Sequence, residues 1–84
     1  MQRFPVGRSA LYELERQSIH PLELVGRHAQ LDPGVLGGSD QAANERALID
    51  GSRLFSAYVY GGDRYYVITE YDRSLTTVML ASDY

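Results

Sequence analysis

The dipeptide Gly61-Gly62 lies between two segments rich in tyrosine, valine, isoleucine and threonine, and it constrains the fold more than any other feature. Two adjacent glycines in this setting are typical of a two-residue β-hairpin, because such turns need residues with positive φ. The sequence therefore predicts antiparallel strands over residues 52–60 and 64–70. A third β-rich segment over residues 74–81 extends the hairpin into a three-stranded meander.

Alternation of side chains divides this meander into two faces. The two-residue loop places Tyr58 opposite Tyr65, and the next turn places Thr69 opposite Thr76. We expect the more apolar face to be covered by helices; its residues are Phe55, Ala57, Val59, Tyr66, Ile68, Leu75 and Met79. The other face would then present Tyr58, Tyr60, Tyr65, Thr69 and Thr76 to solvent. The edges of a three-stranded sheet are expected to be open beside this aromatic patch.

The first half of the chain carries helix signals. Ser9 can cap a helix over residues 10–17, and Pro21 suits the first position of a helix over residues 21–29. A third helix over residues 41–50 can be capped by Ser39 or Asp40. In the second helix we expect Leu22, Val25 and Ala29 to form the buried row. The fold class is therefore α+β, a single domain over residues 1–84, with two or three short N-terminal helices (8–51) packed on a three-stranded antiparallel β-meander (52–81).

Composition excludes several classes of protein. The 84 residues include no cysteine, so disulfides, cysteine-based zinc sites and thiol nucleophiles are ruled out. The formal net charge is −3, so the chain lacks the excess of basic residues expected of a general nucleic-acid binder. No apolar run reaches the length of a membrane span and no signal peptide begins the chain, so the cytoplasm is expected. The spacing of His20 and His28 fits no metal motif, and no metal or other cofactor is expected.

His28 is the first candidate for chemistry. With Arg46, Arg73 and either Ser74 or Thr76, it resembles the histidine, arginine and hydroxyl set of metal-independent ribonuclease toxins of the barnase, EndoU and colicin type. The alternative is that His28 lies near a helix C-terminus, where a cation interacts favourably with the helix dipole. The alternative is favoured, and the protein is expected not to be an enzyme.

Residues 69–74 form the densest polar cluster of the sequence. Glu70 and Asp72 could act as acid and base while Arg73 binds a phosphate or carboxylate. Alternatively, Asp72 and Ser74 form a turn through side-chain bonds to the backbone, and Arg73 pairs with Asp72 or Glu70. The turn is the favoured interpretation.

A protein-binding surface is the other functional prediction. An exposed tyrosine offers a large contact area and loses little side-chain entropy on binding, because it has few rotatable bonds. Tyr58, Tyr60 and Tyr65 are therefore expected to contact a partner or a second copy of the chain. Acidic side chains and the polar turn would complete the surface. These further residues are Glu13, Glu15, Asp40, Glu45, Asp72 and Arg73.

A resemblance covers nearly the whole chain. The tail YYVITEYDRSLTTVMLASDY is similar to the pattern W-I-I-T-E-A-D-R-S-x-T-T-x-L-L-P-E-E-Y. RFPVG, SIHPLELVGRH, the spacing of Asp40 and Asn44, and GSRLFSAY match the same group. The chain departs from the pattern at residues 31–34 and 81–84.

These motifs resemble short plasmid-related proteins of bacterial plasmids, integrative elements and phages, sometimes described as subunit M of a type I restriction endonuclease. That description is not literal, because 84 residues with this pattern leave no room for a nucleotide-cofactor fold. The resemblance implies an accessory gene of a mobile element. Such genes often encode small inhibitors of host defence, so the expected partner is a CRISPR effector or restriction complex, bound without direct contact to nucleic acid.

Overall fold

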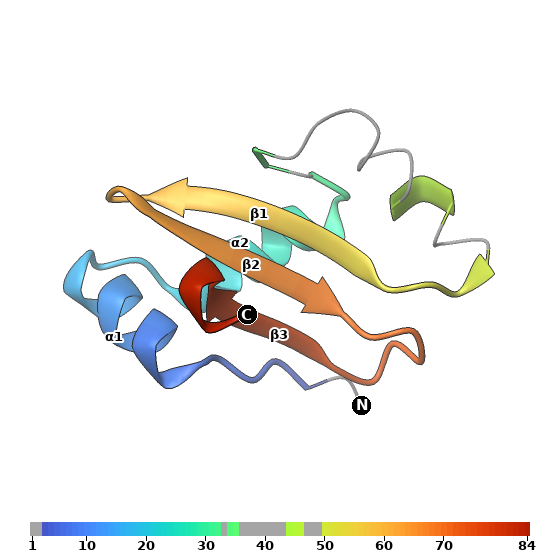
Figure 1. Ribbon diagram of the computed structural model, residues 1–84, viewed down its shortest axis with the longest axis horizontal. Helices are drawn as coiled ribbons and strands as arrows, with labels where there is room; N and C mark the ends of the chain where they lie inside the picture. The colour runs from blue at the N-terminus through green and yellow to red at the C-terminus, as the bar shows by residue number, and fades with distance from the viewer. Residues whose placement is uncertain (1–2, 33, 36–43, 47–49) are drawn as a thin grey trace.

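The computed structural model describes residues 3–32, 34–35, 44–46 and 50–84. Its elements are helix α1 (Arg8–Arg16), helix α2 (Pro21–Ala29), strands β1 (Leu54–Tyr60), β2 (Asp63–Thr69) and β3 (Thr76–Leu80), and a 3-10 turn η1 (Ala81–Asp83). The strands form one antiparallel sheet in the order β1-β2-β3, with α1 and α2 packed on the same face (Figure 1). The predicted α+β class is confirmed.

The strand register follows the glycine turn. Gly61 and Gly62 have φ of 59° and 83°, the positive values that the hairpin requires. Tyr58 pairs with Tyr65 across β1 and β2, and Thr69 pairs with Thr76 across β2 and β3. Both predicted pairings are confirmed.

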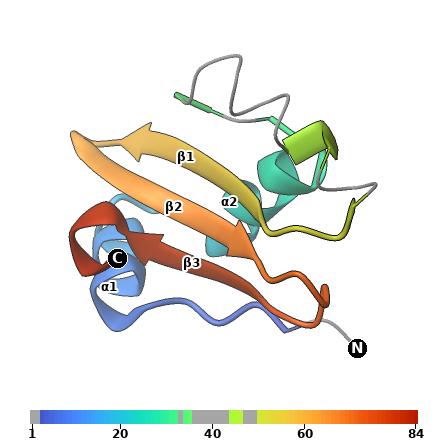
Figure 2. The same cartoon turned by 45° about the vertical axis from the view of Figure 1, so that its right-hand side comes forward.

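Both outer edges of the sheet have backbone partners, so the expectation of open edges is wrong. The N-terminal segment runs parallel to β3 (Figure 2), where the Thr76 N–H donates to the Arg3 carbonyl at 2.9 Å. On the outer edge of β1, the Val35 N–H donates to the Ala57 carbonyl at 2.8 Å. The Asn44 amide bonds both the N–H and the carbonyl of Phe55, at 2.9 and 2.6 Å. Segments outside the three strands therefore protect the sheet from edge pairing.

The two described helices begin close to their predicted starts. Gly7 rather than Ser9 is the N-cap of α1. Pro21 is the first residue of α2, and the His20 Nδ1 accepts from the Leu22 N–H at 3.1 Å. Of the predicted third helix, residues 44–46 are helical. Its proposed caps, Ser39 and Asp40, lie outside the described residues.

The helices cover the face that was expected to be exposed. Tyr58 is 1% exposed and Tyr65 0%, and both pack in one core with residues of α1 and α2. Each phenol has a polar partner: Tyr58 Oη donates to the Asp32 carbonyl at 2.6 Å, and Gln17 Nε2 donates to Tyr65 Oη at 3.2 Å. The assignment of faces was wrong because a buried tyrosine with a bonded hydroxyl packs as a large apolar side chain.

The opposite face carries its own aromatic cluster. The Phe55 and Tyr66 ring centroids lie 4.8 Å apart, and Tyr84, which follows η1, packs edge-on against both rings. Ala57 and Ile68 are buried on this face, whereas Val59 is exposed. Neither face of the sheet is therefore uniformly polar, which explains why the pattern alone assigned them incorrectly.

The buried row of α2 also differs from the prediction. Leu24, Val25 and His28 are buried, while Leu22 and Ala29 are exposed. The helix is rotated about its axis relative to the expected orientation, so that the imidazole of His28 enters the interior. This rotation leaves Leu22 on the surface.

A glycine substitution tests the attachment at the β1 edge. Gly34 has φ of 69°, and a Cβ added there would overlap the Ala57 carbonyl oxygen. We expect Gly34→Ala to lower the free energy of unfolding by more than about 2 kcal/mol, because left-handed strain adds to the clash. Gly26→Ala is the control: its Cβ meets nothing within 4 Å, and in a helix interior it should stabilise by roughly 0.5–1 kcal/mol. Urea denaturation of both variants measures the difference, and equal stabilities would contradict the close contact.

Candidate functional site

His28 lies at the centre of a buried polar network that joins α2 to the sheet. The side chain is 4% exposed. Its Nδ1 is 2.7 Å from the Ser56 Oγ on β1, and its Nε2 is 2.8 Å from the Thr69 Oγ1 on β2. Thr69 Oγ1 in turn lies 2.8 Å from Thr76 Oγ1 on β3. One imidazole therefore links a helix to all three strands.

Burial determines the protonation state of this histidine. Desolvation lowers the pKa of His28 to about 4, so the ring is neutral near pH 7. A neutral imidazole has one N–H donor and one acceptor nitrogen, which matches two hydroxyl partners. Arg27 and His28 do lie in the last turn of α2, as the alternative expected, but His28 is there as a neutral ring and not as a cation. Arg27 supplies the charge there, with its Nε 2.8 Å from the Asp32 carboxylate.

The network makes stability depend on pH. The unfolded chain binds a proton at His28 below its ordinary pKa of 6.5, whereas the folded chain does so only near pH 4. We therefore expect the free energy of unfolding to be highest above pH 6.5 and to fall as pH drops towards 4, by about 3 kcal/mol in total. The pKa of Asp32 is lowered from 3.8, so the contribution of that carboxylate is lost only at lower pH.

Chemical denaturation at a series of pH values measures this dependence. His28→Gln should flatten the curve between pH 4 and 6.5, the window set by the two pKa values. His20→Asn is the matched control, because asparagine retains the N-cap of α2 and leaves His28 in place. A slope that disappears in the control but persists in His28→Gln would contradict the assignment to His28.

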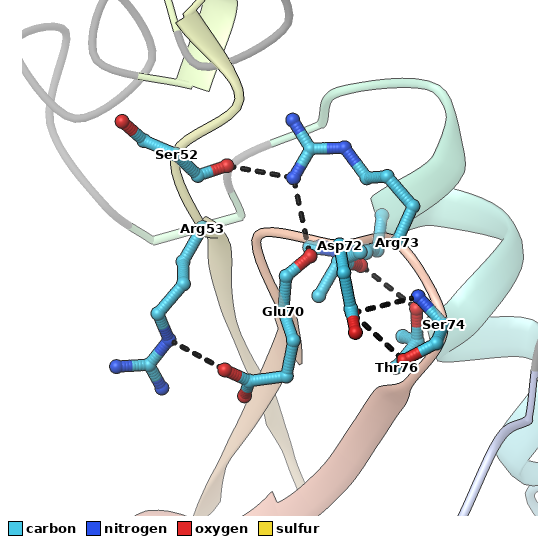
Figure 3. Close-up of polar contacts among 9 residues, drawn as sticks. Ser52, Arg53, Glu70, Asp72, Arg73, Ser74 and Thr76 are labelled. Atoms are coloured by element: carbon cyan, nitrogen blue, oxygen red, sulfur yellow. Dashed lines mark hydrogen bonds and ion pairs between the residues drawn. The ribbon is translucent and has the colours of Figure 1, made fainter.

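The turn between β2 and β3 is built by its own polar side chains (Figure 3). Asp72 Oδ1 accepts from the N–H and hydroxyl of Ser74 at 3.0 and 2.7 Å. Arg73 has φ of 62°, and its NH1 donates to the carbonyls of Ser52 and Glu70 at 2.6 and 3.3 Å. Arg73 thus joins the turn to the chain leading into β1. These bonds agree with the turn interpretation: Arg73 bonds the Glu70 backbone carbonyl, and the Glu70 carboxylate is 3.3 Å from the Arg53 Nε.

Part of the predicted catalytic set does converge. His28, Arg73 and Thr76 line one cavity of about 400 Å³, which Phe4, Val25 and several other apolar residues complete. Arg46 is exposed on residues 44–46 and Ser74 is exposed in the turn, and neither lines this cavity. The His28 nitrogens are already bonded to hydroxyls. Three of the five proposed catalytic residues therefore line one cavity, and the other two do not.

The predicted partner-binding tyrosines do not form a surface patch. Tyr58 and Tyr65 belong to the core, and Tyr60 is half-buried, with its hydroxyl accepting from Arg27 NH1 at 3.1 Å. The Arg27 guanidinium also lies over the Tyr58 ring, 4.2 Å from its centroid. The exposed aromatic surface predicted from Tyr58, Tyr60 and Tyr65 is therefore wrong.

The predicted acidic residues are distributed over several elements. Glu13 is paired with Arg16 at 2.7 Å on α1. Glu15 and Glu45 are exposed, and Asp72 is exposed in the β2–β3 turn. Asp40 lies outside the described residues. Of the four that the structure describes, Glu15 is the one that lies beside the apolar groove described next.

An apolar groove between α1, α2 and the N-terminal segment was not predicted from the sequence. Its volume is about 560 Å³, and its lining residues are Phe4, Val6, Leu11, Glu15, Ser18, Ile19, His20, Pro21, Leu22 and Val25. Three of the apolar lining residues are exposed: Leu22 at 55%, Phe4 at 42% and Leu11 at 37%. The sequence signal that could have indicated this surface is that α1 and α2 carry more apolar residues than one buried row requires.

Comparisons of the chain with protein-family models, curated proteins and solved structures find no match. Within the described parts of the chain, no group of three or more histidine and carboxylate side chains is arranged to hold a metal ion. The described helices are also too short and too polar to cross a membrane. The groove and the His28 network are therefore the features on which a function can be argued.

Proposed function

We propose that this protein is a small non-enzymatic binding module of a mobile element, which inhibits a host defence complex by occupying one of its surfaces. The observation that carries the proposal is the exposed apolar groove between α1 and α2. The class of partner, a CRISPR effector or a restriction complex, comes from the sequence resemblance. The proposed compartment is the cytoplasm of the bacterial host.

The groove has the properties of a protein-binding surface. Leu11, Leu22 and Phe4 line one depression and are all solvent-exposed. Contiguous exposed apolar surface carries a free-energy cost in water that a partner removes on binding. A few side chains buried in a well-packed pocket near the centre of an interface can contribute most of its affinity. This geometry supports binding by the helical side of the molecule.

Charge supports the same class of partner. The chain has a formal net charge of −3, and Glu15 and Glu45 are exposed. Defence complexes that act on nucleic acid have basic channels for the phosphate backbone. Opposite charge speeds the association of two proteins and favours the correct partner over others. An acidic protein with an apolar groove therefore suits a basic protein surface better than a nucleic acid.

A pull-down tests the proposal. The tagged chain should retain a CRISPR effector or restriction complex, and its expression should protect a plasmid or phage from that system. Leu22→Asp places a charge in the groove and should weaken binding by about 10-fold or more. Tyr71→Asp, at an exposed residue outside the groove, should bind as the wild type does.

Absence of both a retained complex and protection would refute the proposed inhibition. Equal loss of binding in Leu22→Asp and Tyr71→Asp would instead show that the groove is not the surface used. Self-association through the groove is the competing outcome. Sedimentation of the wild type and of Leu22→Asp distinguishes it, because only a dimer held by the groove would dissociate in the variant.

A second candidate function is a metal-independent ribonuclease of the barnase, EndoU or colicin type. It is favoured by one observation, that His28, Arg73 and Thr76 line the same cavity. Against it, a neutral His28 with a pKa of about 4 can accept a proton but is not a general acid near pH 7.

Expression in a host without an immunity protein tests the ribonuclease function. A toxin should arrest growth, purified protein should cleave RNA, and Thr76→Val should abolish both effects while it retains a similar side-chain volume. If high-level expression is harmless and cellular RNA stays intact, the ribonuclease function is excluded.

A further inference from the structure

The apolar groove continues along α2 beyond its first cavity. Phe4 and Val25 line both the groove and the neighbouring cavity that contains His28. On α2, Leu22 lines the first cavity and Ala29 the second. Leu22, Val25 and Ala29 have the spacing i, i+3 and i+7, so they form one row along one side of the helix. This row spans two helical turns, about 10 Å.

The opposite wall is formed by α1 and the turn that follows it. Leu11 and Glu15, which line the first cavity, lie at positions i and i+4 on α1. Ser18 also lines the cavity, but it follows the end of the helix at Arg16 and has φ of 58°. Rows of this spacing form ridges between which the side chains of another helix can fit. The groove is thus bounded by a row of α2 and by Leu11 and Glu15 of α1, and Phe4, which is 42% exposed, lines both cavities.

The chemistry of the lining favours a helical occupant. Seven of the ten residues that line the first cavity are apolar, and the others are Glu15, Ser18 and His20. An extended segment buried there would leave backbone N–H and carbonyl groups with few partners. A helix satisfies its own backbone groups, so its apolar face can enter the groove without this cost.

Glu15 specifies the charge of the occupant. It is exposed, and among the described residues that line the two cavities it is the one carboxylate. Within the described residues, the ion pairs join Arg16 to Glu13, Arg27 to Asp32 and Arg53 to Glu70, and none includes Glu15. A cationic side chain beside the apolar face of the occupant would complement this charge.

We propose that the groove binds an amphipathic α-helix of the partner protein, with a lysine or arginine of that helix facing Glu15. The inference rests on the proposed function, because it identifies the partner segment that the groove receives. Phe4, Leu11 and Leu22 contact the apolar side of the helix, and Glu15 fixes its position along the groove.

Two synthetic peptides test this inference without knowledge of the partner. Each is a helix of about 18 residues, long enough to form in water, with leucines at i, i+3, i+4 and i+7, and one tryptophan in the apolar row. One peptide has lysines beside this row, and the other has glutamates at the same positions. The protein contains no tryptophan, so peptide fluorescence reports burial in the complex directly.

The lysine peptide should bind the full chain with a blue shift of its tryptophan emission, about tenfold more tightly than the glutamate peptide. Glu15→Gln should remove most of this preference. Glu23→Gln is the matched control, since it makes the same change of charge at an exposed residue that lines neither cavity. Leu22→Asp should weaken binding of both peptides.

Three results would overturn the inference: no binding of either peptide, equal binding of both, or a preference that survives in Glu15→Gln. These results are separable from failure of the proposed function. Capture of a defence complex without peptide binding would refute only the helical occupant. Peptide binding without capture of any defence complex would refute only the assigned class of partner.

Discussion

The position of His28 between two hydroxyl groups determines how the helices meet the sheet. An imidazole buried at this depth is stable only as the neutral ring with both nitrogens bonded. Ser56 and Thr69 supply those bonds, and Thr69 also contacts Thr76. Ser56, Thr69 and Thr76 therefore all lie on the sheet face that α2 covers. Tyr58 and Tyr65 lie on this same face and pack against α1 and α2. The core of the protein is organised around a polar network as much as around apolar contacts.

The same contact explains where the apolar groove lies. Turning His28 inward rotates α2 so that Leu22 lies at the surface, beside Leu11 of α1 and Phe4 of the N-terminal segment. Meanwhile the edges of the sheet are occupied by the N-terminal segment and by Gly34, Val35 and Asn44. Sheet edges are a common route to association. Here both edges have hydrogen-bond partners, so we place the proposed interface on the apolar groove of the helical side rather than on a sheet edge.

The polar residues that looked catalytic are mostly structural. His28 holds α2 on the sheet, Asp72 and Ser74 form a turn, and Arg73 joins that turn to the carbonyl of Ser52. Such groups contribute to stability and orientation, and their bonds compete with any substrate. A protein of this size must use many of its polar side chains to complete a small core. A surface that binds through shape and apolar contact needs few additional polar side chains.

The sequence by itself determined the local geometry: the glycine turn set the register of β1 and β2, and His20-Pro21 set the start of α2. It also suggested a set of five polar residues, of which His28, Arg73 and Thr76 line one cavity while Arg46 and Ser74 do not. It did not determine which face of the sheet is buried, because Phe55 and Ile68 lie on one face and Val67 and Val78 on the other. That choice depended on His28 and Gln17, whose partners are 28 to 48 residues away in the chain. Alternation divides a strand into two faces, but only the tertiary structure decides which polar groups find partners and can therefore be buried.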